Sequence, residues 1–135
     1  MTQTPPGHAA RPLSPHLQIW RWHVTMFCSI AHRVTGVGLY LGALLLAAWA
    51  VALASGPDAY GAYRSLLGSI PGKVVLFGMT VSIFYHLAAG VRHLVWDVGH
   101  GYQPRTADMT GAVCIAFSVV ASAAVWVLAG MMGAL

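Results

Sequence analysis

Three side chains able to bind a polar ligand stand together near the start of a long apolar stretch. Ser29, His32 and Arg33 are spaced i, i+3 and i+4, so they share one face of a helix, and Gly36 continues that face. Ionisable groups at membrane depth are costly and usually face a bundle interior, a cavity or a cofactor. The segment therefore predicts a binding face for a polar group at the mouth of a membrane helix.

A second polar face is predicted around His86, the ionisable side chain within the apolar stretch 74–91. His86, Gly90, His93 and Asp97 are spaced i, i+4, i+7 and i+11 and again share a helix face. A neutral imidazole deep in a bilayer, beside a glycine that leaves room for a flat ligand, suits axial ligation of a haem iron. The competing interpretation is that His86 only hydrogen-bonds a neighbouring helix and Gly90 only permits helix packing.

Basic groups near the membrane boundary suit the polar ends of such ligands. His32, Arg33 and Arg92 could bind the two propionates of a haem. Ser29 and Arg33 could donate hydrogen bonds to the carbonyl of a quinone. The alternative for either arginine is that its guanidinium extends to the lipid headgroups. Ligand binding is favoured by the conjunction of two polar faces at compatible depth.

Composition indicates a membrane protein. Of the 135 residues, 58% are hydrophobic and 7% are charged, against about 25% charged residues in soluble domains. The seven Lys and Arg residues are spread along the chain without a basic patch, so nucleic-acid binding is not expected. Cys28 and Cys114 lie in apolar segments outside any thiolate metal or haem-attachment motif, and are expected to be small buried side chains.

The hydrophobic pattern predicts an all-α membrane protein with three transmembrane helices. Residues 1–22 are expected to form a Pro-rich N-terminal tail and an interfacial segment, and residues 23–135 the three-helix unit. The spans are expected at about 24–54, 74–97 and 109–134, each long enough to cross a hydrocarbon core of ~30 Å. Residues 55–73 are expected to connect the first two spans.

The distribution of basic residues predicts the orientation. Arg64 and Lys73 fall on one side of the three-span topology, and five arginines fall on the other: Arg11, Arg21, Arg33, Arg92 and Arg105. The N-terminus is therefore expected in the cytoplasm and the C-terminus in the periplasm. The second span then enters from the outer face near residue 74, which places His86 roughly 18 Å into the bilayer. Arg92 emerges at the level of Arg33. The spans lack an internal proline and a midplane charge pair, so transport is not favoured.

Three motifs in register resemble one protein family. They are Arg11-Pro12-Leu13-Ser14-Pro15-His16-Leu17, Ser29-Ile30-Ala31-His32-Arg33-Val34-Thr35-Gly36, and His86-x-x-x-Gly90-Val91-Arg92-His93-Leu94-x-Trp96-Asp97. In order, spacing and three-helix length they closely resemble the cytochrome b556 subunit of succinate dehydrogenase, the larger membrane-anchor subunit of respiratory complex II. Trp20 stands where many relatives have tyrosine, and this keeps an aromatic side chain at the interface.

The resemblance implies a non-catalytic membrane anchor for the flavoprotein and iron–sulfur subunits, built into a larger helical bundle with a second small three-helix anchor. In that family the histidine matching His86 is one axial ligand of haem b, and the partner anchor supplies the other. The serine and arginine matching Ser29 and Arg33 line the ubiquinone site, and in many relatives the arginine serves both the quinone and the haem edge. The histidine matching His32 approaches the haem propionates, and Arg92 is a further candidate there.

Two other functions remain open from the sequence. One is a purely structural anchor without haem or quinone contact, and the other is a fumarate-reductase-type anchor running the reaction in the opposite direction. An anchor holding two haems is not expected, because the sequence offers one deep histidine. The first ten residues resemble neither a secretory signal nor a transit peptide, which favours the bacterial inner membrane over the mitochondrial inner membrane.

Overall fold

The computed structural model describes residues 14–133, so residues 1–13 of the tail and interfacial segment expected over residues 1–22 lie outside the described residues. A short 3₁₀-helix, η1 (His16–Ile19), is followed by four α-helices: α1 (Val24–Ala54), α2 (Pro57–Gly68), α3 (Ile70–Asp97) and α4 (Pro104–Met131). Residues 14–133 contain no strand. The helices α1, α3 and α4 are long and apolar enough to cross a membrane, which confirms the predicted all-α fold with three spans.

The connection between α1 and α3 is itself helical, which the sequence analysis did not predict. Gly56, with φ of 106°, adopts a backbone conformation that favours glycine and redirects the chain after α1. Pro57 at the first helical position and Asp58 in the first turn then favour the start of α2. The turn into α3 is tight, because a Cβ on Gly72 would lie 2.5 Å from two backbone carbonyl oxygens of α2.

The long helices begin at residues that favour helix starts. The Ser69 side chain caps α3 by accepting a hydrogen bond from the Gly72 backbone N–H at 3.2 Å. Pro104 occupies the start of α4. As a result α3 begins at Ile70 and α4 at Pro104, a few residues before the starts expected from hydropathy alone.

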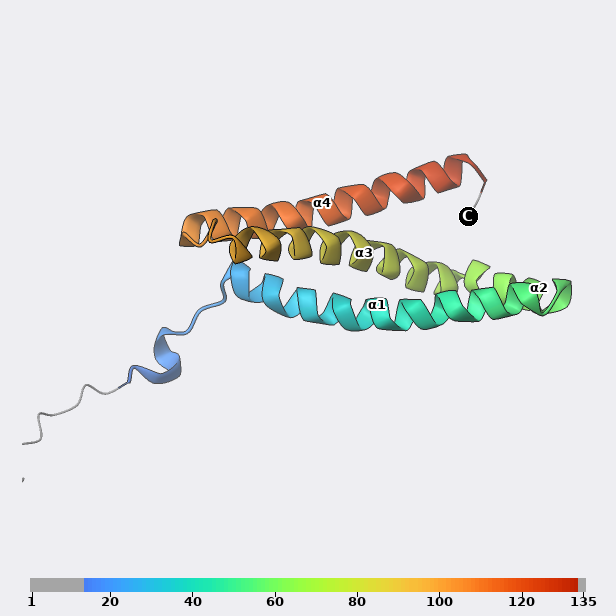
Figure 1. Ribbon diagram of the computed structural model, residues 1–135, viewed down its shortest axis with the longest axis horizontal. Helices are drawn as coiled ribbons and strands as arrows, with labels where there is room; N and C mark the ends of the chain where they lie inside the picture. Colours follow the sequence, from blue (N-terminus) through green and yellow to red (C-terminus); the bar gives the residue numbers. More distant parts are fainter. Residues whose placement is uncertain (1–13, 134–135) are drawn as a thin grey trace, which may run out of the picture.

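The helix α3 lies between α1 and α4 (Figure 1). The chain passes from the α1–α2 end of the molecule back along α3 to the loop that precedes α4. In Figure 1, α4 lies close to α3 near Pro104 and diverges from it toward the C-terminal end. The closest three-helix packing is therefore at the end where α1 begins, which is also the end that carries His32 and Arg33.

Small side chains on α4 allow this close packing. They follow one buried face of the helix: Ala107, Gly111, Cys114, Ser118 and Ser122. A Cβ on Gly111 would lie 2.9 Å from Cys28 Sγ of α1. The Ser118 and Ser122 hydroxyls donate to carbonyl oxygens of their own helix, so they can be buried without a partner elsewhere. Cys28 and Cys114 are buried and free, as predicted.

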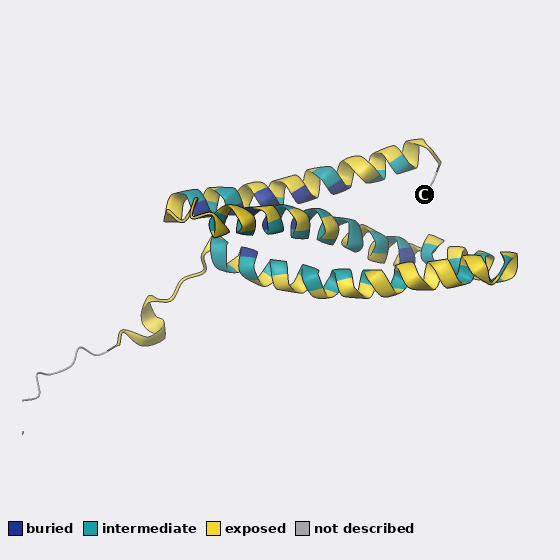
Figure 2. Cartoon of the chain, in the orientation of Figure 1, coloured by how far each residue is buried: buried dark blue, intermediate teal, exposed yellow. Residues whose placement is uncertain are grey.

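Most of the remaining helix surface is exposed and apolar (Figure 2). The buried residues concentrate where the three long helices meet, and the outward faces carry large side chains such as Val37, Leu44 and Val120. Because every backbone polar group of a membrane helix is satisfied within the helix, such faces suit lipid or further membrane helices.

Candidate functional site

The imidazole of His86 lies against the backbone of α1. Its Nδ1 is 3.2 Å from the His32 carbonyl oxygen and 3.3 Å from Thr35 Oγ1. The Thr35 hydroxyl donates to the Ala31 carbonyl oxygen at 2.8 Å, so its proton is already used. Both oxygens near Nδ1 therefore act as acceptors, and we assign the ring proton to Nδ1 and the lone pair to Nε2.

Gly36 allows this close approach of α3 to α1. A Cβ at that position would lie 3.1 Å from His86 Cε1, closer than ordinary van der Waals contact. Gly90, one turn along from His86, instead borders open space, with no atom of another described helix within 4 Å of a Cβ placed there. The lack of a side chain at Gly36 thus lets the His86 imidazole pack against α1, and the lack of one at Gly90 leaves room beside the imidazole.

Three histidine rings stack across the α1–α3 contact. The centroids of the His32 and His86 rings are 4.1 Å apart, with an angle of 22° between the planes, and those of His32 and His93 are 4.8 Å apart at 18°. His93 is fixed by its own helix, since its Nδ1 lies 2.7 Å from the Ala89 carbonyl oxygen. His32 lies between the other two rings.

His32 has an unsatisfied ring nitrogen. Among the described residues, its Nε2 is a buried polar side-chain atom without a hydrogen-bond partner. Buried polar groups in native proteins are nearly always hydrogen-bonded, so an unpartnered one points to a group supplied from outside the chain. This atom lies beside His86, on the polar face predicted from the sequence.

Ser29 and Arg33 lie on the same helix, toward its N-terminal end. Ser29 is half-buried and Arg33 is exposed. Within residues 14–133, no hydrogen bond engages either side chain, so the hydroxyl and the guanidinium remain available to a ligand. The structure therefore brings His32 together with His86, while Ser29 and Arg33 lie on α1 within one turn of His32 without a contact to His86.

Arg92 lies on a different side of α3. Its side chain is buried, and Nε donates to Thr110 Oγ1 at 3.1 Å while Nη2 donates to the Ala107 carbonyl oxygen at 2.8 Å. The guanidinium carbon lies 3.9 Å from the centroid of the Trp96 ring. These contacts join α3 to α4, whereas His86 and His93 face α1. The role predicted for Arg92 at a haem propionate stays a prediction, and Nη1 is the nitrogen left for it.

We expect Arg92→Met to destabilise the protein. The change removes one buried and one partly buried hydrogen bond from a charged donor, together with the contact with Trp96, a loss of about 1–3 kcal/mol. The measurement is the thermal unfolding midpoint of the purified protein in detergent. Arg105→Met, which changes an exposed arginine in the first turn of α4, should leave that midpoint nearly unchanged. Equal unfolding midpoints for the wild type and Arg92→Met would show that the contacts of Arg92 do not stabilise the packing of α3 against α4.

The class of protein follows from these features. Three helices of membrane length, with a stack of imidazoles at the α1–α3 contact, define a transmembrane helical subunit with a polar face between two of its spans. The family model for the succinate dehydrogenase/fumarate reductase transmembrane subunit matches residues 8–125. The chain belongs to this family, as the three motifs predicted.

Individual relatives agree with the family assignment. The chain is 39% identical over 110 residues to the succinate dehydrogenase cytochrome b556 subunit of Paracoccus denitrificans, covering 82% of this chain and 85% of the relative. It is 32% identical over 117 residues to the same subunit of Rickettsia felis, covering 87% and 91%. It is also 35% identical to the mitochondrial succinate dehydrogenase cytochrome b560 subunit of Sus scrofa, covering 83% and 68%.

Proposed function

We propose that this chain is the membrane-anchor subunit of a succinate:ubiquinone oxidoreductase that co-ligates haem b and forms part of the ubiquinone-reduction site. The observation that carries the proposal is the contact of His86 Nδ1 with two acceptor oxygens of α1. From this contact we assign the ring proton to Nδ1, which leaves the lone pair of Nε2 free to ligate iron. The names of the relatives support it, since they are cytochrome b subunits of succinate dehydrogenase.

The residues present fit a haem. A ligating histidine usually donates its second ring N–H to a carbonyl or carboxylate, which fixes the tautomer and orients the ring, and the His32 carbonyl oxygen does this for His86. The unpartnered Nε2 of His32 could donate to a propionate, and Arg33 could neutralise one. When bound, the haem would supply a one-electron carrier beside the quinone site. The second axial ligand would come from the partner anchor.

The quinone site would use donors from α1. Ser29 Oγ and the Arg33 guanidinium can both donate to a quinone carbonyl oxygen, and neither is engaged within the described part of the chain. The positive charge of an arginine would stabilise negative charge on that oxygen during reduction. The haem midpoint potential of Arg33→Leu decides whether Arg33 serves the quinone alone or also a propionate.

The remaining parts of the proposal concern assembly and location. The partners would be a second small anchor, an iron–sulfur subunit and a flavoprotein subunit, with the exposed apolar faces of the helices meeting the second anchor and lipid. The membrane would be the bacterial inner membrane, with the N-terminus cytoplasmic and the C-terminus periplasmic. The succinate oxidation itself would belong to the flavoprotein, and this chain would contribute the quinone pocket.

Purification of the complex through a tag on this chain tests the proposal. We expect mass spectrometry to identify four subunits, the reduced-minus-oxidised visible spectrum to show a b-type haem, and succinate to reduce ubiquinone. A complete complex without b-type absorbance would favour a purely structural anchor instead. Faster reduction of fumarate by quinol than of ubiquinone by succinate would favour a fumarate-reductase-type anchor.

A further inference from the structure

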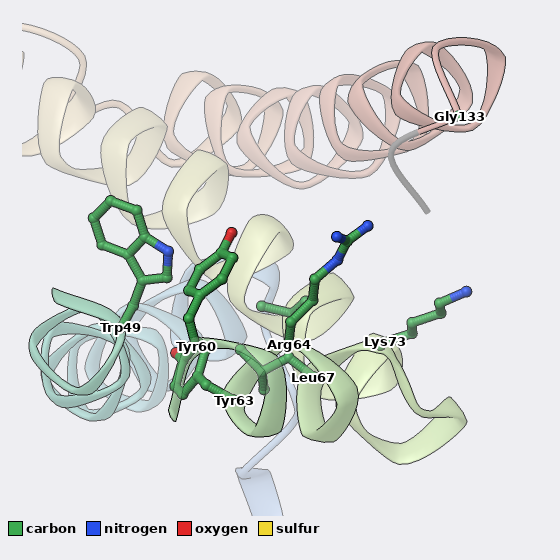
Figure 3. A pocket seen from close by; sticks show the side chains of 9 residues that line it. Trp49, Tyr60, Tyr63, Arg64, Leu67, Lys73 and Gly133 are labelled. Carbon is green, nitrogen blue, oxygen red and sulfur yellow. The ribbon is translucent and has the colours of Figure 1, made fainter. Parts of the chain in front are cut away.

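A cavity of about 340 Å³ lies at the end of the bundle opposite the histidine stack, where α1, α2 and α3 meet (Figure 3). Arg64 of α2 and Lys73 of α3 both line it, together with the aromatic residues Trp49, Tyr60 and Tyr63. These two cations are the basic residues that the sequence places on the outer side of the membrane. None of the described acidic side chains lines the cavity. The cavity therefore carries a net positive charge.

A second cavity, of about 570 Å³, lies beside the first along the α1–α3 contact. Four residues line both cavities: Trp49, Tyr63, Leu67 and Leu76. Apart from Tyr63, all residues that line the second cavity are apolar or glycine. The hydroxyl of Tyr63 donates to the Leu45 carbonyl oxygen at 2.8 Å, which holds this ring at the junction. A cationic chamber, the first cavity, and an apolar slot, the second cavity, therefore lie side by side.

The chamber offers several hydrogen-bond donors as well as charge. In Figure 3 the guanidinium of Arg64 and the ammonium of Lys73 extend on the side of α2 and α3 that faces the C-terminal end of α4. Within residues 14–133, the Tyr60 hydroxyl and the Trp49 indole N–H make no hydrogen bond. Cations with neighbouring aromatic donors are the groups that meet phospholipid headgroups at a membrane boundary.

We propose that these two cavities form a binding site for one anionic phospholipid of the outer leaflet. The phosphate would lie between Arg64 and Lys73, and an acyl chain would lie in the slot between α1 and α3. A free phosphate would leave the apolar slot unfilled, and an uncharged amphiphile would leave two cations without a counter-charge. The site lies at the opposite end of the molecule from His86, so the proposal is independent of the haem and quinone assignments.

Native mass spectrometry of the detergent-purified chain, with the subunits that co-purify, tests this proposal. Phosphatidylglycerol and phosphatidylcholine are titrated in parallel. We expect phosphatidylglycerol to bind more tightly, and the double change Arg64→Gln with Lys73→Gln to weaken it about tenfold or more, because two charge-assisted contacts to phosphate are lost. Replacing Arg105, an exposed arginine at the other end, by glutamine is the matched control and should leave phosphatidylglycerol binding unchanged.

Two further measurements identify the molecule that fills the two cavities. Ala43 is exposed and lines the apolar slot, so Ala43→Phe should reduce phosphatidylglycerol binding while leaving both cations in place. Inorganic phosphate at millimolar concentration should not displace the lipid. Equal binding by wild type and the double variant, or displacement by inorganic phosphate, would overturn the proposal. Loss of a co-purifying subunit from Ala43→Phe, with phosphatidylglycerol binding unchanged, would show that a protein helix fills the slot and would also overturn it.

Discussion

Replacing His86 with leucine should remove the b-type haem absorbance from the purified complex. The change deletes Nε2, the nitrogen that α1 leaves free for iron, and replaces it with an alkyl side chain that cannot ligate. Haem affinity should fall by more than the roughly 10–100-fold that follows loss of an outer-shell hydrogen bond to a ligating histidine. The measurement is haem content per complex, from the pyridine haemochrome spectrum and the amount of protein.

Assembly must be separated from ligation in this experiment. Leucine is similar in size to histidine, so the packing of residue 86 against Gly36 should not change greatly. The subunit stoichiometry reports whether the complex still forms. His100→Leu is the matched control, because His100 is exposed in the loop after α3. A fully assembled His86→Leu complex with unchanged haem content would exclude His86 as the ligand.

The overall fold could be predicted because membrane insertion depends on hydropathy and length. The range of α1 follows directly from the apolar stretch and the turn residues after it. The helix α2 was missed because it is too short and too polar to register as a span. Its start signals, Pro57 and Asp58, were present in the sequence, as was the spacing of Tyr60, Tyr63 and Leu67 along one face.

The polar helix face could be predicted from the sequence, whereas its contacts could not. Helical spacing placed Ser29, His32 and Arg33 on one face, and the structure brings that face to His86. The part played by Thr35 depends on the rotation of α1 against α3, which no spacing rule gives. The stacking of His93 on His32 depends on it too. The contacts of Arg92 could not be predicted either. Arg92 is next to His93 in the sequence, yet its side chain contacts α4 while His93 contacts α1.

Replacing Arg33 with leucine should lower ubiquinone reduction and leave succinate oxidation by an artificial dye nearly intact. Arg33 is exposed on α1 and is not engaged by any described residue, so its loss should not disturb helix packing. A charge-assisted hydrogen bond contributes about 1.5–3 kcal/mol, and its loss at the reacting carbonyl should lower the quinone rate roughly 10–100-fold. Both rates are measured on the same purified complex.

A control variant and the haem midpoint potential complete this experiment. Arg105→Leu removes an exposed cation from the start of α4 and should leave both rates unchanged. Equal loss of quinone and dye reduction in Arg33→Leu would indicate failed coupling to the other subunits rather than a lost donor. The haem midpoint potential then shows which group the Arg33 charge serves. Removing a cation near the haem stabilises the oxidised haem and lowers the potential. A potential that falls along with the quinone rate would therefore mean that Arg33 also neutralises a propionate. An unchanged potential would assign Arg33 to the quinone alone and leave the propionates to His32 and the partner anchor.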